Sequence, residues 1–146
     1  MQTTPDWLRP VTHLLLALPL ALLVGQWFLL LTTGDARGAG LTSDPIAATI
    51  NHLGLWAFRF LLLVLAITPF RRLSGWTPIM SIRRAVGLWA FAYAALHVAS
   101  YLGLDLLGAL DLLWDDIVKR RYILFGMGAF LCLLPLAITS TRGWIK

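Results

Sequence analysis

The sequence contains no glutamate, and its acidic side chains are limited to seven aspartates among 146 residues. Charged residues make up only 13% of the chain, whereas hydrophobic residues make up 59%. Soluble domains carry roughly a quarter of charged residues, so this composition excludes an ordinary soluble domain. The scarcity of charge and the abundance of apolar residues indicate a membrane protein.

Cysteine is almost absent as well. Cys132 is the single cysteine, which excludes an intrachain disulfide and predicts a buried, unreactive thiol within an apolar stretch. The net charge of +5 would suit a nucleic-acid ligand, but the basic residues gather at the ends of apolar stretches. They form no stripe with interleaved aromatic residues, so we expect the lipid bilayer, and no nucleic acid, as the partner of this charge.

Four apolar stretches are long enough to cross about 30 Å of hydrocarbon at about 1.5 Å per helical residue. They cover residues 11–31, 46–68, 82–104 and 122–139. The first stretch is too long for the apolar part of a signal peptide and is followed by no clear cleavage site, so we interpret it as a retained helix. The sequence predicts an all-α integral membrane protein with four transmembrane helices in one domain over residues 1–146.

Several local signals refine these helices. Asp44 and Pro45 predict the start of the second helix, and Pro69 predicts its end. Pro19 and Pro135 predict kinks in the first and fourth helices. In the third helix, a ridge of small residues at four-residue spacing predicts a close approach of another helix: Ala95, Ala99 and Gly103.

The segment from Asp105 to Arg121 differs from the four spans. Its leucines, Trp114 and Ile117 recur at helical spacing, while its aspartates and Lys119 occupy the other side. This pattern predicts an amphipathic helix on the outer membrane surface, either as a connector or as a docking face for an outer partner.

The distribution of basic residues predicts the orientation. With the N-terminus in the cytoplasm, four basic residues lie on the outer side, namely Arg37, Lys119, Arg120 and Arg121. Apart from Arg59 in the middle of a span, the other seven lie on the inner side: Arg9, Arg71, Arg72, Arg83, Arg84, Arg142 and Lys146. Seven against four favours this orientation, because short cytoplasmic segments carry an excess of Lys and Arg. The sequence therefore predicts a membrane protein with several passes and a cytoplasmic N-terminus.

His97 is a candidate metal ligand, because a polar imidazole inside hydrocarbon is costly unless it has a partner and haem iron accepts a neutral nitrogen donor. It lies about 10 Å from the outer end of the third helix. Tyr93, Ser100 and Tyr101 stand three or four residues away and share its face, so a planar macrocycle could lie along this stripe. The alternative for His97 is an interhelical hydrogen bond.

Two residues of the second helix are further candidates. His52 lies about 9 Å from the outer end, at a depth similar to that of His97, so the two imidazoles could bind one iron. Arg59 lies near the middle of the bilayer and two turns from His52. No membrane-embedded carboxylate is available to it, so its candidate partners are a haem propionate, a flavin phosphate, a quinone oxygen or backbone carbonyls.

Three runs of the sequence resemble a known family: HLGLWAFRFLLLVLAITPFRR, SIRRAVGLWAFAYAALHVASYLGLD and DIVKRRYILFGMGAFLCLLPLAITST. They are similar to the MsrQ family, haem-binding membrane subunits of periplasmic methionine sulfoxide reductase systems within the ferric-reductase-like transmembrane group. The resemblance extends from about Leu14 to Thr141. Its most specific part is the pattern RRxxGLWAFxYAxLHxxSY.

This resemblance implies a haem b protein of the bacterial inner membrane, with FMN as a further cofactor, that transfers electrons and does not itself reduce the sulfoxide. Electrons would pass from membrane quinol to a periplasmic, molybdopterin-containing catalytic subunit that repairs oxidised proteins. His97 matches a family haem ligand, whereas His52 and Arg59 match typical positions of the second helix. Tyr93 and Tyr101 are expected beside the cofactor.

The sequence also departs from the family pattern. The family has about six spans, and a fifth helix carries two further histidines, whereas this chain stops at Lys146. We therefore expect a C-terminally incomplete domain whose second haem ligand comes from a missing helix, from His52 or from another subunit. The rival interpretations are a cofactor-free structural or inactive four-helix protein, and a small quinone-binding or transport protein that uses Arg59.

Overall fold

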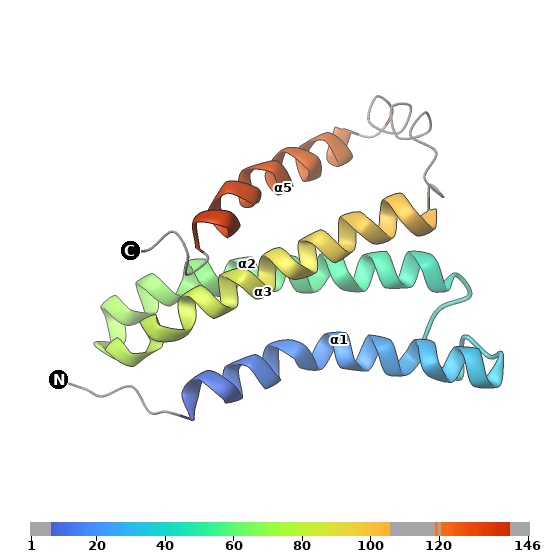
Figure 1. The fold of residues 1–146 in the computed structure, drawn as a ribbon, viewed down its shortest axis with the longest axis horizontal. Helices are drawn as coiled ribbons and strands as arrows, with labels where there is room; N and C mark the ends of the chain where they lie inside the picture. The colour runs from blue at the N-terminus through green and yellow to red at the C-terminus, as the bar shows by residue number, and fades with distance from the viewer. Residues whose placement is uncertain (1–6, 106–118, 120, 141–146) are drawn as a thin grey trace.

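The computed structural model describes residues 7–105, 119 and 121–140. Within this part of the chain the regular elements are helices, and none is a strand. They pack as a membrane-type bundle in which α1 and α5 lie on opposite sides of α2 and α3 (Figure 1). In chain order they are α1 (Leu8–Thr33), α2 (Pro45–Ser74), the 3-10 turn η1 (Thr77–Ile79), α3 (Met80–Ser100), the π turn η2 (Tyr101–Asp105) and α5 (Arg121–Thr139).

The four expected membrane spans are confirmed. α1, α2, the continuous segment Thr77–Asp105 and α5 are each long and apolar enough to cross a bilayer, with mean hydropathies of 2.3, 2.0, 1.4 and 2.1. Large apolar side chains such as Leu14 and Leu65 are exposed on the helix surfaces, as a lipid environment allows. The chain is a multi-pass membrane protein. The amphipathic helix predicted between Asp105 and Arg121 lies outside the described residues, apart from its ends and Lys119.

The start of α2 follows the prediction, but its end does not. Asp44 caps the helix by accepting a hydrogen bond from the Ala47 N–H at 3.0 Å, and Pro45 occupies the first turn. The prediction that α2 ends at Pro69 is wrong, because the helix continues to Ser74. A single proline is tolerated within a membrane helix, and the terminating residue is Gly75, whose φ of 68° gives the left-handed cap.

The core lies where α2 and α3 face each other and α1. Phe60 of α2 and Ala90 and Tyr93 of α3 are the most deeply buried apolar side chains, at 2%, 0% and 0% exposure. Two residues of the predicted ridge take no part in this packing, because Ala99 is exposed and a Cβ added to Gly103 would have no heavy atom within 4 Å. The close approach occurs instead at Gly54 of α2.

α1 is attached to α3 by a hydroxyl group. The Tyr93 hydroxyl donates to the Leu16 carbonyl and accepts from the Leu20 N–H, each at 2.9 Å. Pro19 precedes Leu20 and has no N–H of its own, so the backbone ladder of α1 is weakened where the tyrosine enters. α1 changes direction in this middle region, as the predicted kink requires (Figure 1).

α5 is the most exposed helix. None of its residues is buried in the described structure. Its clearest anchor is Phe130, whose ring stacks on Phe91 of α3 with centroids 5.7 Å apart and an angle of 4° between planes. Cys132 is exposed on this helix, so the expectation of a buried thiol is wrong. The reason is that α5 packs along one side only, which leaves most of its apolar surface to lipid.

Candidate haem-ligand site

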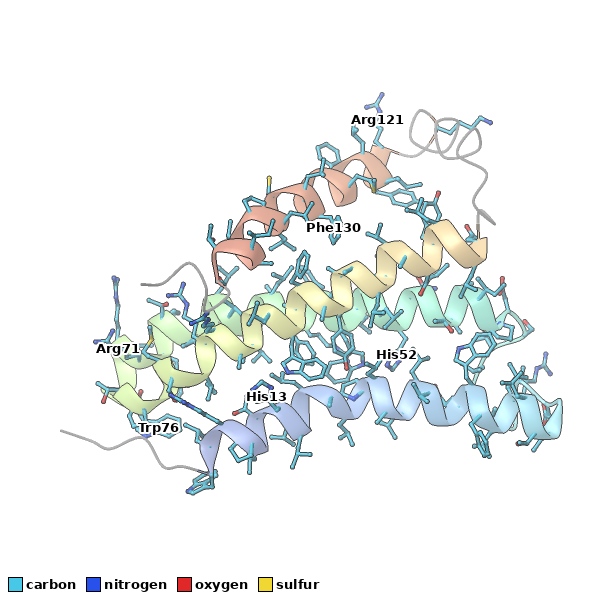
Figure 2. The ribbon with its side chains drawn as sticks, viewed as in Figure 1. His13, His52, Arg71, Trp76, Arg121 and Phe130 are labelled. Carbon is cyan, nitrogen blue, oxygen red and sulfur yellow. The ribbon has the colours of Figure 1, made fainter. Side chains whose placement is uncertain are left out.

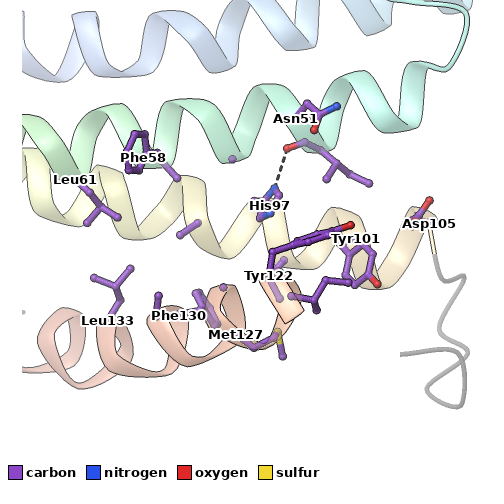
Figure 3. A pocket seen from close by; sticks show the side chains of 18 of the residues that line it. Asn51, Phe58, Leu61, His97, Tyr101, Asp105, Tyr122, Met127, Phe130 and Leu133 are labelled. Carbon is purple, nitrogen blue, oxygen red and sulfur yellow. Dashed lines mark hydrogen bonds between the residues drawn. The ribbon is translucent and has the colours of Figure 1, made fainter. Parts of the chain in front are cut away.

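A cavity of about 600 Å³ lies between α2, α3 and α5. It extends to the end of the bundle that carries Asp105, which we call the acidic end because the three described aspartates, Asp35, Asp44 and Asp105, lie there, although Arg37 and Arg121 lie there too. Figure 3 shows its lining side chains, which converge from all three helices and η2. They are mostly apolar, and the polar ones among them are Asn51, His97, Tyr101, Asp105 and Tyr122.

His97 is fixed within this cavity by the backbone of α2. Its Nδ1 lies 2.8 Å from the Ile50 carbonyl oxygen, which is the dashed contact in Figure 3. A carbonyl can only accept a hydrogen bond, so Nδ1 carries the proton and the neutral ring keeps its lone pair on Nε2. Metal-ligating histidines are commonly oriented in this way, with one ring nitrogen donating to a carbonyl and the other left for the metal.

Gly54 makes room for the imidazole. A Cβ built on this residue would lie 2.9 Å from both Cε1 and Nδ1 of His97, closer than real side chains approach. Ile50 and Gly54 are four residues apart, so one turn of α2 supplies both the hydrogen-bond acceptor and the space for the ring. The position of His97 is therefore determined by α2 as much as by its own helix.

Tyr101 also lines the cavity, as predicted for a residue beside His97. It begins η2, where the helix widens to a π turn immediately after the last regular turn of α3. Such π turns are rare and occur frequently at functional sites. The structure therefore brings Tyr101 and His97 to the same cavity.

Tyr93 is placed differently, although it lies only one turn from His97. Its side chain is fully buried and its hydroxyl is bonded to α1, so it does not line the cavity. Its ring packs edge-on against Phe60, with centroids 5.1 Å apart. In the described structure its contacts are those of a residue that joins helices.

His52 faces away from His97. Its Nε2 lies 3.1 Å from the Pro19 carbonyl oxygen of α1, and Figure 2 shows it on the side of α2 that faces α1. His52 is thus held at the interface of α2 with α1, and His97 at the interface of α3 with α2. The structure does not bring His52 and His97 together around one iron position.

Arg59 is exposed and does not line the cavity. Its guanidinium carbon lies 4.7 Å from the centroid of the Trp56 ring, a cation–π geometry. The centroid of the His52 ring lies 6.4 Å from the centroid of the same Trp56 ring. The predicted alignment of His52 and Arg59 along one stripe of α2 is therefore present, with Trp56 between them.

Several cavity residues escaped the sequence analysis, among them Asn51 and Gly54 of α2 and Tyr122 and Met127 of α5. Gly54 carried a usable signal, because a glycine inside a span often marks a close helix approach. The α5 residues carried none, because nothing in their spacing shows which face meets α3. Among the described residues, no group of three or more histidine, cysteine or acidic side chains could hold a metal, so His97 is a single imidazole in an apolar cavity.

The model of the ferric reductase like transmembrane component family matches residues 53–146, which include the whole of α3 and α5. The chain belongs to this family. Among curated relatives, the chain is 46% identical to the protein-methionine-sulfoxide reductase heme-binding subunit MsrQ of Xanthomonas oryzae pv. oryzae (strain MAFF 311018). The match covers 94% of this chain and 62% of that relative.

A second relative with the same name, from Rhodospirillum rubrum, is 51% identical over 109 residues, which are 75% of this chain and 52% of the relative. This ferric-reductase-like chain thus spans less than two thirds of the length of the MsrQ proteins that it matches. No solved structure matches the chain.

Proposed function

We propose that this ferric-reductase-like chain binds haem b and transfers electrons within a methionine sulfoxide reductase system, with His97 as an axial ligand of the iron. The observation that carries the proposal is the hydrogen bond from His97 Nδ1 to the Ile50 carbonyl at 2.8 Å. It leaves Nε2 as the unprotonated nitrogen, the donor that haem iron binds. The names of the MsrQ relatives, which are heme-binding subunits, support the same cofactor.

The cavity around His97 suits a large, flat and mainly apolar group. Its volume of about 600 Å³ lies within the usual range of cofactor pockets, and its walls are apolar except at the acidic end. Bound haem would supply a reversible one-electron change at iron. Phe58 and Phe130 would exclude water from its faces, while Asn51 and Tyr101 stand among the polar groups available to its edge.

We propose that any second axial ligand comes from outside the described cavity lining, in which His97 is the one histidine. His52 would have to leave the Pro19 carbonyl and turn from the α1 side of α2 to serve this role. A segment beyond the described residues or another subunit could supply a ligand without such a change.

We further propose that electrons come from membrane quinol and pass to a periplasmic, molybdopterin-containing catalytic subunit that reduces methionine sulfoxide. In this arrangement the chain lies in the bacterial inner membrane with its N-terminus in the cytoplasm. His97 and its cavity then lie in the outer half of the bilayer, on the side of the catalytic partner. FMN would be a further cofactor, and Arg59 would offer a cation to an anionic cofactor group from outside the cavity.

An absorption spectrum tests the proposal. The full chain, purified in mild detergent and supplemented with haem, should show a Soret band that shifts on reduction with dithionite. His97→Ala should abolish the band, whereas His52→Ala should retain it, because His52 faces α1. The absence of a Soret band in the unsubstituted chain, or its persistence in His97→Ala, would contradict the assignment.

One observation favours a second candidate, a cofactor-free structural membrane protein. The bond between His97 and the Ile50 carbonyl is also the interhelical contact that a purely structural histidine would make. In that case His97→Gln should preserve unfolding stability and no haem should bind at any concentration. The haem titration therefore separates the two functions.

A further inference from the structure

A second cavity, of about 520 Å³, lies along the same helices at the opposite end of the bundle. We call this the basic end, because Arg71, Arg72, Arg83 and Arg84 gather there. Figure 2 shows Arg71 and Trp76 at this end, remote from Arg121. The stacked rings of Phe91 and Phe130 contribute one wall to each cavity, because Phe91 lines the second and Phe130 the first.

The second cavity combines two arginines with apolar walls. Arg83 and Arg84 lie in the first turns of α3, and both line the cavity. The walls below them are apolar, with Leu61 and Val64 from α2 and Leu133 from α5. The cavity therefore has a cationic mouth at the end of the spans and an apolar interior that continues toward the middle of the bundle.

Among residues 7–105, 119 and 121–140, no carboxylate lies at this end of the bundle to pair with the two arginines. The three described aspartates, Asp35, Asp44 and Asp105, all lie at the acidic end, and the sequence contains no glutamate. The hydroxyl of Thr139, which also lines the cavity, already donates to the Pro135 carbonyl at 2.8 Å. The described residues that line the cavity thus do not balance the charge of Arg83 and Arg84.

We propose that this cavity binds an anionic phospholipid, with its phosphate between Arg83 and Arg84 and an acyl chain along the apolar walls. A membrane-spanning chain meets such lipids at the level of its terminal turns, and pockets between spans with basic residues bind anionic head groups. A small soluble anion would satisfy the arginines but leave the apolar walls unfilled. The proposal rests on the charge and shape of this cavity and is independent of haem.

Saturation binding tests the site. The full chain in mild detergent would be titrated with fluorescent phosphatidylglycerol and, separately, with phosphatidylcholine of the same acyl chains, with inorganic phosphate as a competitor. We expect saturable binding of phosphatidylglycerol, and binding of phosphatidylcholine that is at least about tenfold weaker, because only the former carries a net charge. Competition by inorganic phosphate at concentrations similar to those of the lipid would overturn the assignment to a lipid.

Matched pairs of substitutions separate this cavity from the general basic charge. Arg83→Gln with Arg84→Gln should weaken phosphatidylglycerol binding by about tenfold or more. Arg71→Gln with Arg72→Gln removes the same charge at the same end, but from residues that do not line the cavity, and should leave the affinity within about twofold. Equal losses in the two pairs, or no loss in either, would overturn the proposal.

A third variant tests the apolar interior without a change of charge. Ala137 lines the cavity on α5, so Ala137→Phe should occupy the space of the acyl chain and reduce binding of phosphatidylglycerol. Leu131→Phe on the exposed face of α5 is its control. Undiminished binding in Ala137→Phe would place the lipid elsewhere. The Soret band of the haem-loaded chain should persist in Ala137→Phe, so failure of the lipid proposal and failure of the haem proposal are distinguishable.

Discussion

At Gly54 the chain lacks a side chain where the imidazole of His97 needs the space. A Cβ there would lie 2.9 Å from the ring, so Gly54→Ala should push His97 away and break its bond to the Ile50 carbonyl. Overpacking of this kind costs about 1–3 kcal/mol. We expect Gly54→Ala to lower the free energy of unfolding and to weaken haem binding, as measured by unfolding in mixed micelles and by haem titration.

Gly87→Ala is the matched control for this substitution. A Cβ at Gly87 would lie 3.9 Å from Val64 Cγ2, which is an ordinary contact. Because alanine favours a helix over glycine by roughly 0.5–1 kcal/mol, this variant should be neutral or slightly more stable and should bind haem normally. Equal behaviour of the two alanine variants would show that Gly54 does not position His97.

The residue scale also shows how far sequence spacing can place a side chain. The helical repeat correctly put Tyr101 beside His97, and both line the cavity. The same repeat grouped Tyr93 with them, but this side chain reaches α1 instead. Residues four apart differ by roughly 40° around a helix, so a long side chain near a boundary between two seams can enter either one. The positions of the neighbouring helices determine which interface the side chain enters, and these positions cannot be read from the sequence of one helix.

Among the elements, α1 is bound to its neighbours by several polar contacts, of which the one made by the Tyr93 hydroxyl is the most buried. The Tyr93 hydroxyl bridges Leu16 and Leu20, which would otherwise be partners in a regular helical turn. Tyr93→Phe should therefore cost only about 1 kcal/mol, because the backbone of α1 can close its own hydrogen bond. The free energy of unfolding in mixed micelles measures this cost, and amide exchange at Leu20 should remain slow because its N–H regains a partner in the Leu16 carbonyl.

A control for α1 uses another side-chain hydrogen bond between α1 and α3. Trp89 Nε1 donates to His13 Nδ1 at 2.9 Å in an exposed position. His13→Ala should cost no more than Tyr93→Phe, because the exposed Trp89 N–H that loses its acceptor can bond to another partner. A loss above 3 kcal/mol in Tyr93→Phe would instead show that the bridge cannot be replaced within α1.

The attachment of α5 depends on aromatic stacking. Phe130→Ala removes the stack on Phe91 and should destabilise α5 by more than the roughly 0.5–1.5 kcal/mol of the aromatic pair alone, because apolar contact is lost as well. We expect faster amide exchange across α5 with little change in α1 and α2. Phe125→Ala on the same helix is the control, since Phe125 is 75% exposed. Similar exchange in both variants would mean that the stack does not hold α5.

The existence of the helices could be predicted from sequence more reliably than their ends. Hydrocarbon thickness fixes the minimum length of a span, so four long apolar stretches could only become four helices. The prediction that α2 ends at Pro69 was wrong. It considered only the backbone hydrogen bond that a proline removes, whereas a membrane helix tolerates that loss when neighbouring groups satisfy the freed carbonyl. Gly75, with its left-handed conformation, was the better signal.

At the scale of the molecule, charge and cavities divide the bundle in the same direction. The cavity with His97 opens toward the acidic end, and the cavity with Arg83 and Arg84 opens toward the basic end. The aromatic stack of Phe91 and Phe130 lies between them. A redox group near one surface and a lipid near the other would thus use two parts of one seam, without competition for space.

The same division predicts the orientation in the membrane. Because cytoplasmic segments carry an excess of basic residues, the basic end should face the cytoplasm and the acidic end the periplasm. Alkaline phosphatase fused after Gly38, between α1 and α2, should be active, since this enzyme folds in the periplasm. The same enzyme fused after Gly75, between α2 and α3, should be inactive, whereas green fluorescent protein at Gly75 should fluoresce. Active phosphatase at Gly75 would reverse the topology and place His97 in the inner half of the bilayer, remote from a periplasmic electron acceptor.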